Sequence, residues 1–139
     1  MKKSILICLM TIAGYGICAA QKTDEVKVKK LAETSSSWDG TPLPSYPKGQ
    51  PQITVLCYTF PAHKILDTHY HTIISSGVVL EGELTIVAKD GKEKTFRTGE
   101  ALVETIGTLH YGENRGDIPT KVIVFYAGKQ GVPLSIKSK

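Results

Sequence analysis

The sequence predicts an all-β protein with a single compact domain. Short runs rich in β-branched and aromatic residues recur from Ile53 to Ala127, and turn signals separate them. No stretch of the chain shows a convincing helical period. Many short strands joined by tight turns in one small domain are typical of a β-sandwich, a jelly roll or a small barrel.

Six β-rich runs define the expected strands, which in chain order are residues 53–60, 77–80, 84–88, 92–97, 101–104 and 120–127. A strong turn signal, Asp90-Gly91, stands between two lysines. It predicts a hairpin with a two-residue type I′ turn, which requires positive φ at both central residues. Closing the strands into a barrel would remove exposed sheet edges and create an interior where polar side chains can converge.

The chain before these strands divides into two parts. Residues 1–20 have the features of a secretory signal peptide, because Lys2 and Lys3 precede an apolar run that ends in a small-residue cleavage site. The run is too short for a membrane-spanning helix, which needs roughly 20 apolar residues. Residues 21–52 are polar and rich in proline, and they predict an irregular N-terminal arm. The barrel domain is then expected to occupy residues 53–139.

The signal predicts export, to the periplasm if the source is bacterial, with no stable membrane insertion after cleavage. Cys18 also fits a lipoprotein signal. However, bulky Ile17 precedes it, where a lipid-attachment signal prefers a small residue. We therefore expect release as a soluble protein rather than lipid anchoring.

The composition excludes several classes of protein. Cleavage after residue 20 would leave 119 of the 139 residues, enough for one domain and not for two. Without Lys2 and Lys3 the formal net charge falls from +4 to +2, and no basic cluster is interleaved with aromatic residues. Nucleic acid is therefore not an expected partner. Cys57 would be the only remaining cysteine, which excludes an internal disulfide, and its apolar surroundings favour an inert buried thiol.

Three histidines carry the chemistry of this sequence. His69 and His71 are two residues apart, so on an extended strand their imidazoles project from the same face. His110 follows a glycine-containing turn later in the chain and can reach them from another strand. Three imidazoles in one cavity would suit a borderline transition metal, with nitrogens about 2.0–2.1 Å from a zinc-like ion.

Two motifs containing these histidines resemble those of the cupin superfamily. The first family motif is Gly, five residues, His-x-His, three or four residues, Glu, six residues and Gly, and it maps onto His69, His71 and Gly82. The second is Gly, five residues, Pro-x-Gly, two residues, His, three residues and Asn, and it maps onto Gly99, Gly107, His110 and Asn114. The resemblance extends over residues 53–127 and is strongest to small single-domain bacterial cupins. It implies a jelly-roll barrel, or double-stranded β-helix, and a metal bound by His69, His71 and His110.

Three positions depart from the motifs. Ser75 stands where the family's metal-binding glutamate would be, His63 replaces the leading glycine, and Thr105 replaces the proline. A hydroxyl is a poor metal ligand beside a carboxylate, so the expected ligand set is three neutral imidazoles. Such a set would bind an ion more weakly and leave open coordination positions, as catalytic metal sites do. Ser75 also has a simpler explanation, as a small residue that lets the barrel pack.

Two further side chains stay open as members of the site. Glu104 is close to His110 in sequence and could supply the missing carboxylate, but the direction of its side chain cannot be read from the sequence. His63 could be a fourth imidazole, a proton carrier or a solvated loop residue, and we favour the last. Trp38 and Tyr46 in the arm could form a lid over the barrel or an edge contact with a second subunit.

The resemblance implies a divalent transition metal, with Fe, Zn, Cu, Ni and Mn all compatible, and chemistry on a small molecule at that ion. Acquisition outside the cell would favour Cu or Zn by affinity, whereas the frequency of iron dioxygenases among cupins favours Fe. A dioxygenase-like or isomerase-like enzyme is the first hypothesis. The alternatives are a module that binds a metal or small molecule without catalysis, and a barrel that no longer binds metal. The resemblance also suggests a homodimer.

Overall fold

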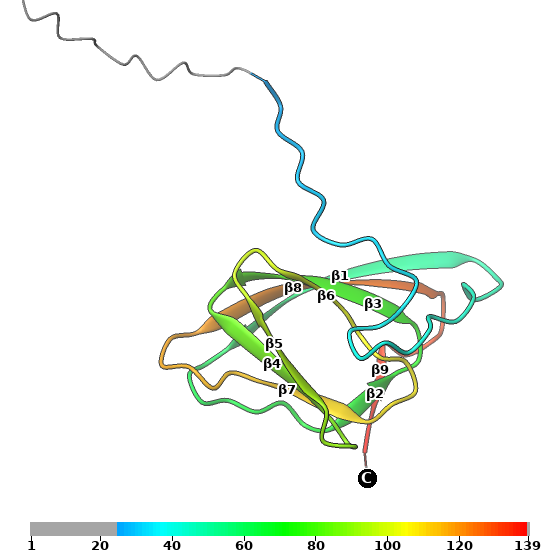
Figure 1. Ribbon diagram of the computed structural model, residues 1–139. Helices are drawn as coiled ribbons and strands as arrows, with labels where there is room; N and C mark the ends of the chain where they lie inside the picture. Colours follow the sequence, from blue (N-terminus) through cyan, green and yellow to red (C-terminus); the bar gives the residue numbers. More distant parts are fainter. Residues whose placement is uncertain (1–24, 139) are drawn as a thin grey trace, which may run out of the picture.

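The structure, a computed structural model, describes residues 25–138, which form two antiparallel β-sheets facing each other (Figure 1). The four-stranded sheet contains, in spatial order, β1 (Pro51–Phe60), β8 (Thr120–Lys129), β3 (Ile74–Glu81) and β6 (Ala101–Val103). The five-stranded sheet contains β5 (Glu93–Arg97), β4 (Glu83–Ala88), β7 (His110–Glu113), β2 (His69–His71) and β9 (Ser135–Lys137). No helix occurs between residues 25 and 138, so the predicted all-β class and jelly-roll barrel are confirmed.

Three strands of the five-stranded sheet are not among the six runs expected from the sequence. These are β2 and β9, with three residues each, and β7, with four. Strands this short show no measurable periodicity in the sequence. They exist because β2 pairs with β7 on one side and with β9 on the other, which are contacts between distant parts of the chain.

The hairpin between β4 and β5 forms, but its turn differs from the prediction. Gly91 has a φ of 85°, whereas Asp90 does not have a positive φ, so the type I′ assignment is wrong. The Gly91 N–H donates to the carbonyl of Ala88 at 2.9 Å, and the Ala88 N–H donates to the carbonyl of Lys92 at 2.8 Å. The loop therefore has three residues and ends in a left-handed glycine, another common hairpin form.

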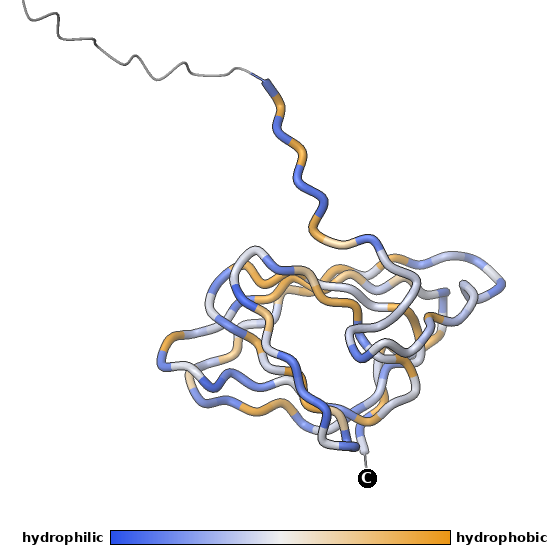
Figure 2. Tube along the Cα trace, viewed as in Figure 1, coloured by the Kyte–Doolittle hydropathy of each residue, from blue (hydrophilic) through white to orange (hydrophobic). Residues whose placement is uncertain are grey.

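The barrel interior is filled by side chains that alternate along the strands toward the opposite sheet. Val79, Ile86 and Leu102 are at most 1% exposed. Full burial of such a side chain stabilises the fold by about 1.5–3 kcal/mol. Apolar segments accordingly run along the strands of both sheets, while the connecting loops are mostly polar (Figure 2).

The outer faces of the two sheets differ in character. On the four-stranded sheet Val55 lies opposite Phe125, and Cys57 lies opposite Ile123. We call these four residues and Ile53 the outer apolar face. Cys57 is exposed on this face, so the expectation of a buried thiol is wrong. Both faces of β1 carry apolar residues, and the sequence therefore did not reveal which side of the strand packs inward.

Charged pairs cover the outer face of the five-stranded sheet instead. The Arg97 guanidinium contacts the Glu83 carboxylate at 3.0 Å, and the Arg115 guanidinium contacts the Glu93 carboxylate at 2.8 Å. These pairs are about half exposed, so each contributes little to stability. They nevertheless keep this face compatible with water.

The N-terminal arm contributes no long strand between residues 25 and 50. Its first described residues extend away from the barrel, with alternating charged and apolar residues (Figures 1 and 2). The arm then returns to the barrel, where the backbone N–H of Trp38 donates to the carbonyl of Val103 at 2.9 Å. Trp38 thus covers the edge of β6 in its own chain, whereas Tyr46 is 76% exposed. The expected signal peptide, residues 1–20, lies outside the described residues, and within 25–138 there is no helix able to cross a membrane.

Several motif residues have structural roles in this barrel. Gly82 has a φ of 74°, and a Cβ atom there would lie 2.6 Å from the Thr120 hydroxyl oxygen, so only glycine fits. Asn114 is 1% exposed, and its amide donates to three backbone carbonyls, those of Phe60, Pro61 and Ile118. His63, which replaces the first motif glycine, has a φ of 58°, a left-handed conformation that costs a residue with a Cβ about 1–2 kcal/mol.

Candidate metal centre

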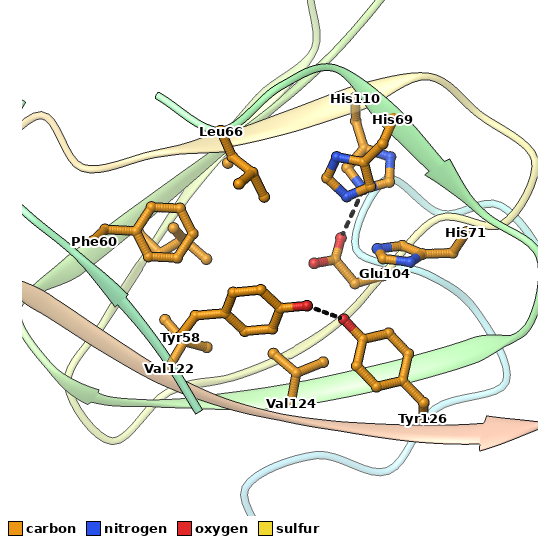
Figure 3. A pocket seen from close by; sticks show the side chains of 12 residues that line it. Tyr58, Phe60, Leu66, His69, His71, Glu104, His110, Val122, Val124 and Tyr126 are labelled. Atoms are coloured by element: carbon orange, nitrogen blue, oxygen red, sulfur yellow. Dashed lines mark hydrogen bonds and ion pairs between the residues drawn. The ribbon is translucent and has the colours of Figure 1, made fainter. Parts of the chain in front are cut away.

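The three predicted histidines converge inside the barrel from two strands of the five-stranded sheet (Figure 3). His69 and His71 project inward from β2, and His110 projects from β7 directly opposite His69. The ring centroids lie 4.8 to 5.1 Å apart, and one ligand nitrogen from each ring falls within 4.8 Å of the others. Strand alternation and the β2–β7 register together produce this cluster, because both place the rings on the same inner face.

Each imidazole is fixed by a hydrogen bond from its Nδ1 atom to a backbone carbonyl. His69 Nδ1 donates to the carbonyl of Asp67 at 2.8 Å, and His71 Nδ1 donates to that of Leu134 at 3.1 Å. His110 Nδ1 donates to the carbonyl of Thr108 at 2.8 Å. A neutral imidazole with its proton on Nδ1 keeps a lone pair on Nε2. Such backbone partners orient metal-binding histidines and fix their tautomer.

Burial keeps two of these imidazoles uncharged in the folded protein. It lowers the pKa of His71 to about 4 and also lowers the pKa of His110, because the charged form is poorly solvated inside the barrel. Both rings are therefore neutral at neutral pH, which is the form that binds a metal ion. Thr105, which replaces the motif proline, is fully buried, with its hydroxyl oxygen 3.2 Å from His110 Nδ1.

Glu104 belongs to this site, which the sequence left open. It follows β6 directly, is 9% exposed, and places its Oε2 atom 3.4 Å from His110 Nε2 (Figure 3). Burial raises the pKa of this carboxyl to about 7. Ser75 is fully buried, and its hydroxyl has no hydrogen-bond partner among the described residues.

His63 does not join the cluster. Its ring is on the protein surface with its Nε2 atom 3.1 Å from the Asp117 carboxylate, and its side chain is 66% exposed. The preferred expectation, a solvated loop residue, agrees with this position.

A pair of tyrosines that the sequence analysis did not single out completes the site. The hydroxyls of Tyr58 on β1 and Tyr126 on β8 are hydrogen-bonded at 2.9 Å (Figure 3). Burial raises the pKa of Tyr126, so its hydroxyl stays protonated. The centroids of the Tyr126 and His71 rings are 5.7 Å apart. Strand alternation could have placed both tyrosines on the inner face. However, the two strands carry apolar residues on both faces, so the sequence does not show which face is the inner one.

The rings, Glu104 and the tyrosines line a cavity of about 40 Å³, and the remaining wall is apolar. The apolar lining residues are Phe60, Leu66, Leu84, Val122 and Val124. A neighbouring groove of about 190 Å³ shares Tyr58, His69 and His71 with the cavity and is also lined by Ser135 and Lys137. The site is therefore small and mostly apolar, and it borders a larger groove.

Comparison with known proteins assigns the fold to a family, since the cupin domain family matches residues 57–126. The chain belongs to the cupin family. No match is found among curated proteins. The family match spans both motifs and therefore includes all three clustered histidines.

Solved structures with the same fold include several bacterial enzymes. Oxalate decarboxylase from Lactobacillus farciminis, in a formate complex, is 17% identical with a TM-score of 0.54, covering 61% of this chain and 26% of its own. The DMSP lyase DddQ from Ruegeria pomeroyi is 17% identical with a TM-score of 0.54, covering 71% and 47%. Oxalate decarboxylase from Bacillus subtilis, described with Mn(II) centres, is 18% identical with a TM-score of 0.53, covering 61% and 23%. The chain spans about a quarter to a half of the length of these proteins, and the likeness is one of fold.

Proposed function

We propose that this cupin binds one divalent transition metal through the Nε2 atoms of His69, His71 and His110. The observation that carries the proposal is the common orientation of the rings, each held by an Nδ1 hydrogen bond to a backbone carbonyl. A barrel that had lost its metal would have no need for three buried rings fixed in one tautomer. Imidazole nitrogens suit Fe, Zn, Cu and Ni, and the Mn(II) centres of a protein with the same fold keep Mn among the candidates.

We further propose that a small oxygen-bearing molecule reacts at this site. A bound divalent ion would polarise such a molecule as a Lewis acid or exchange electrons with it. The cavity of about 40 Å³ has room for about three waters, at the ~10–15 Å³ that one water needs, so the reacting part of the ligand must be small. One of the Tyr58 and Tyr126 hydroxyls donates to the other, and the second is left to donate a hydrogen bond to the molecule. The apolar wall excludes water from the reacting atoms.

Elemental analysis of the purified protein tests the metal proposal. We expect close to one equivalent of a transition metal in the wild-type protein and none after His69→Ala and His110→Ala substitution. His63→Ala is the matched control, because it removes a histidine outside the cluster and should retain the metal. Metal retained in the His69 and His110 variants would refute the proposal.

The alternative is a cupin that binds a metal or a small molecule without converting it. Metal-loaded protein should consume oxygen or change a metabolite in an extract if it is an enzyme. Protein treated with a chelator is the control for that measurement. Stoichiometric metal with no turnover of oxygen or of any metabolite would favour the binding module.

We also propose that residues 1–20 direct export of the protein and are then removed by cleavage after residue 20. The charged and apolar parts of that segment support this, and mass spectrometry of the mature protein should find Gln21 at its N-terminus. A lipid on Cys18 would indicate anchoring instead.

We propose in addition that two copies associate through the outer apolar face. Ile53, Val55 and Phe125 on this face are 66%, 47% and 41% exposed, although they are adjacent on paired strands. Contiguous exposed apolar surface of this kind is typical of association sites. A two-fold contact would bury the same face on both copies, which suits a patch without charged residues.

A further inference from the structure

The Glu104 side chain is buried, and its Oε2 atom has no hydrogen-bond partner among residues 25–138. The side chain is only 11% exposed. An uncompensated buried carboxylate is costly, and native proteins rarely keep one without a bound ion, a water or a functional role. The position of this group therefore needs an explanation.

The atom that Glu104 faces is also without a partner. His110 Nε2 is buried, has no hydrogen bond within the described chain, and lies 3.4 Å from Glu104 Oε2. The proton of this ring is on Nδ1, which donates to the carbonyl of Thr108. With Glu104 ionised, two lone pairs thus point at each other, which is unfavourable unless a positive charge, from a shared proton or a cation, lies close to both atoms. A cation held between them would satisfy both.

The backbone places Glu104 directly across from the motif position that lacks its carboxylate. Ser76 pairs with Val103 in the antiparallel β3–β6 ladder, so Ser75 and Glu104 are the next opposed pair on the same inner face. The Glu104 N–H donates to the carbonyl of Ser75 at 3.0 Å, which continues the ladder. Ser75 is fully buried, and its hydroxyl also has no hydrogen-bond partner among the described residues.

We propose that Glu104 is the fourth protein ligand of the metal, so that the carboxylate of the family motif has moved from position 75 on β3 to position 104 after β6. This inference rests on the proposed metal site. The ligand set would then contain three nitrogens and one charged oxygen. A carboxylate oxygen suits harder ions than imidazole does, so this set extends the range of fitting metals toward Mn(II) and Fe(II).

The ligand role can be tested with Glu104→Gln, which keeps the size of the side chain and removes its charge. We expect the dissociation constant for Mn(II), measured by chelator competition, to rise by about 100-fold or more, beyond the ~10–100-fold typical of groups that only support a ligand. The visible spectrum of the Co(II)-loaded protein should also change, because the number and type of ligands determine it. Glu113→Gln is the matched control, since Glu113 is also buried but pairs with Arg115.

A double substitution that exchanges Ser75 and Glu104 distinguishes a metal ligand from a residue that only supports folding. In Ser75→Glu/Glu104→Ser the carboxylate returns to the motif position, and we expect Mn(II) affinity to recover to within about tenfold of the wild-type value. Circular dichroism melting of the metal-free variants shows whether each one folds. If Glu104→Gln is unfolded, the swap alone decides the question, because recovered affinity supports the ligand role and lost affinity in a folded swap contradicts it.

Different experimental outcomes would overturn the role of Glu104 and the proposed metal site. Wild-type affinity and an unchanged Co(II) spectrum in Glu104→Gln, together with lost binding in His110→Ala, would overturn only the role of Glu104. Absence of Mn(II), Co(II) and Zn(II) binding by the wild-type protein, together with no metal in the purified protein, would overturn the metal site itself and, with it, the fourth ligand.

Discussion

The five-stranded and four-stranded sheets face the same cavity but present different atoms to it. The five-stranded sheet supplies the imidazole nitrogens of His69, His71 and His110, each oriented by a backbone carbonyl. The four-stranded sheet and the residue after β6 supply oxygens, from Tyr58, Tyr126 and Glu104.

This difference suggests that the two sheets have different roles in binding a metal and its ligand. The imidazoles are pre-oriented, so they would lose little freedom when a metal binds and would determine affinity. On the opposite wall, within residues 25–138, the two tyrosine hydroxyls are hydrogen-bonded only to each other and Glu104 Oε2 has no hydrogen-bond partner, so these oxygens can contact metal or ligand. We infer that the oxygen side determines which metal and which small molecule the site prefers. Four predictions test this comparison, and a fifth concerns the loop that joins the sheets.

The largest expected effect is that of removing an imidazole from the five-stranded sheet. His71→Ala should weaken binding of Zn(II) by a factor of about 1,000 or more, or ~4 kcal/mol, because the ion loses a ligand in a dry site. Tyr126→Phe, on the opposite sheet, should change the affinity by less than about tenfold. Chelator competition on both variants provides the measurement, and equal losses would remove the distinction between the sheets.

Opposing pH dependences of stability are expected from the two sides of the metal-free cavity. The His71 pKa falls from 6.5 to about 4 on folding, so the unfolded state binds more protons in that range and stability rises with pH. The Glu104 pKa rises from 4.5 to about 7, so the folded state binds more protons and stability falls as pH rises. Each effect is worth roughly 3 kcal/mol over its range, and they largely cancel between about pH 4.5 and 6.5.

Glu104→Gln should remove only the second of these effects. Urea unfolding in the presence of chelator would then show stability increasing from pH 4.5 to 6.5, while the wild-type protein changes much less. The lowered pKa of His110 adds to the increase. A variant with the same pH profile as the wild-type protein would show that Glu104 does not oppose the histidines.

Metal binding should stabilise the whole barrel against unfolding. The ion binds only the folded state, because the unfolded chain does not bring His110 on β7 close to the two histidines on β2. At a metal concentration 100 times the dissociation constant, the expected gain is about 2.7 kcal/mol. Differential scanning fluorimetry with and without Zn(II) measures it as a higher melting temperature. The same shift in His69→Ala/His110→Ala protein would place the stabilising ion elsewhere.

The outer faces should differ as clearly as the inner ones. Phe125→Glu, on the outer apolar face, should weaken self-association by about 30-fold or more, the ~2 kcal/mol expected of a central contact residue. Val87→Glu is the matched control on the charged outer face of the five-stranded sheet and should leave association unchanged. Light scattering over a range of protein concentrations measures both, and a wild-type protein that stays monomeric would refute the dimer.

The smallest effect on stability is expected from a substitution in the loop between β1 and β2, which connects the two sheets. His63→Gly should stabilise the fold by about 1 kcal/mol, because glycine adopts a φ of 58° without steric cost. Chemical denaturation measures the change, and metal affinity should not move. A destabilised variant would mean that the exposed contact with Asp117 outweighs the backbone strain.

The sequence predicts the nitrogen side of the cavity much better than the oxygen side. The spacing of His69 and His71 determines that they share a face, and the second motif brings His110 opposite them. The role of Glu104 depends on the β3–β6 register, which pairs residues far apart in the chain and leaves no local pattern. β9 and β7 were missed for the same reason, since their strands are defined by their partners rather than by their own residues.

The last strand of the barrel has a consequence for how the site is assembled. β9 pairs with β2 along both histidines, and the carbonyl that orients His71 belongs to Leu134, close to the C-terminal end of the chain. The nitrogen cluster therefore cannot reach its final geometry until residues 134–137 are in place beside β2. Deletion of residues 134–137, or a bulky insertion among them, would disturb the centre directly, although these residues bear no ligand atom.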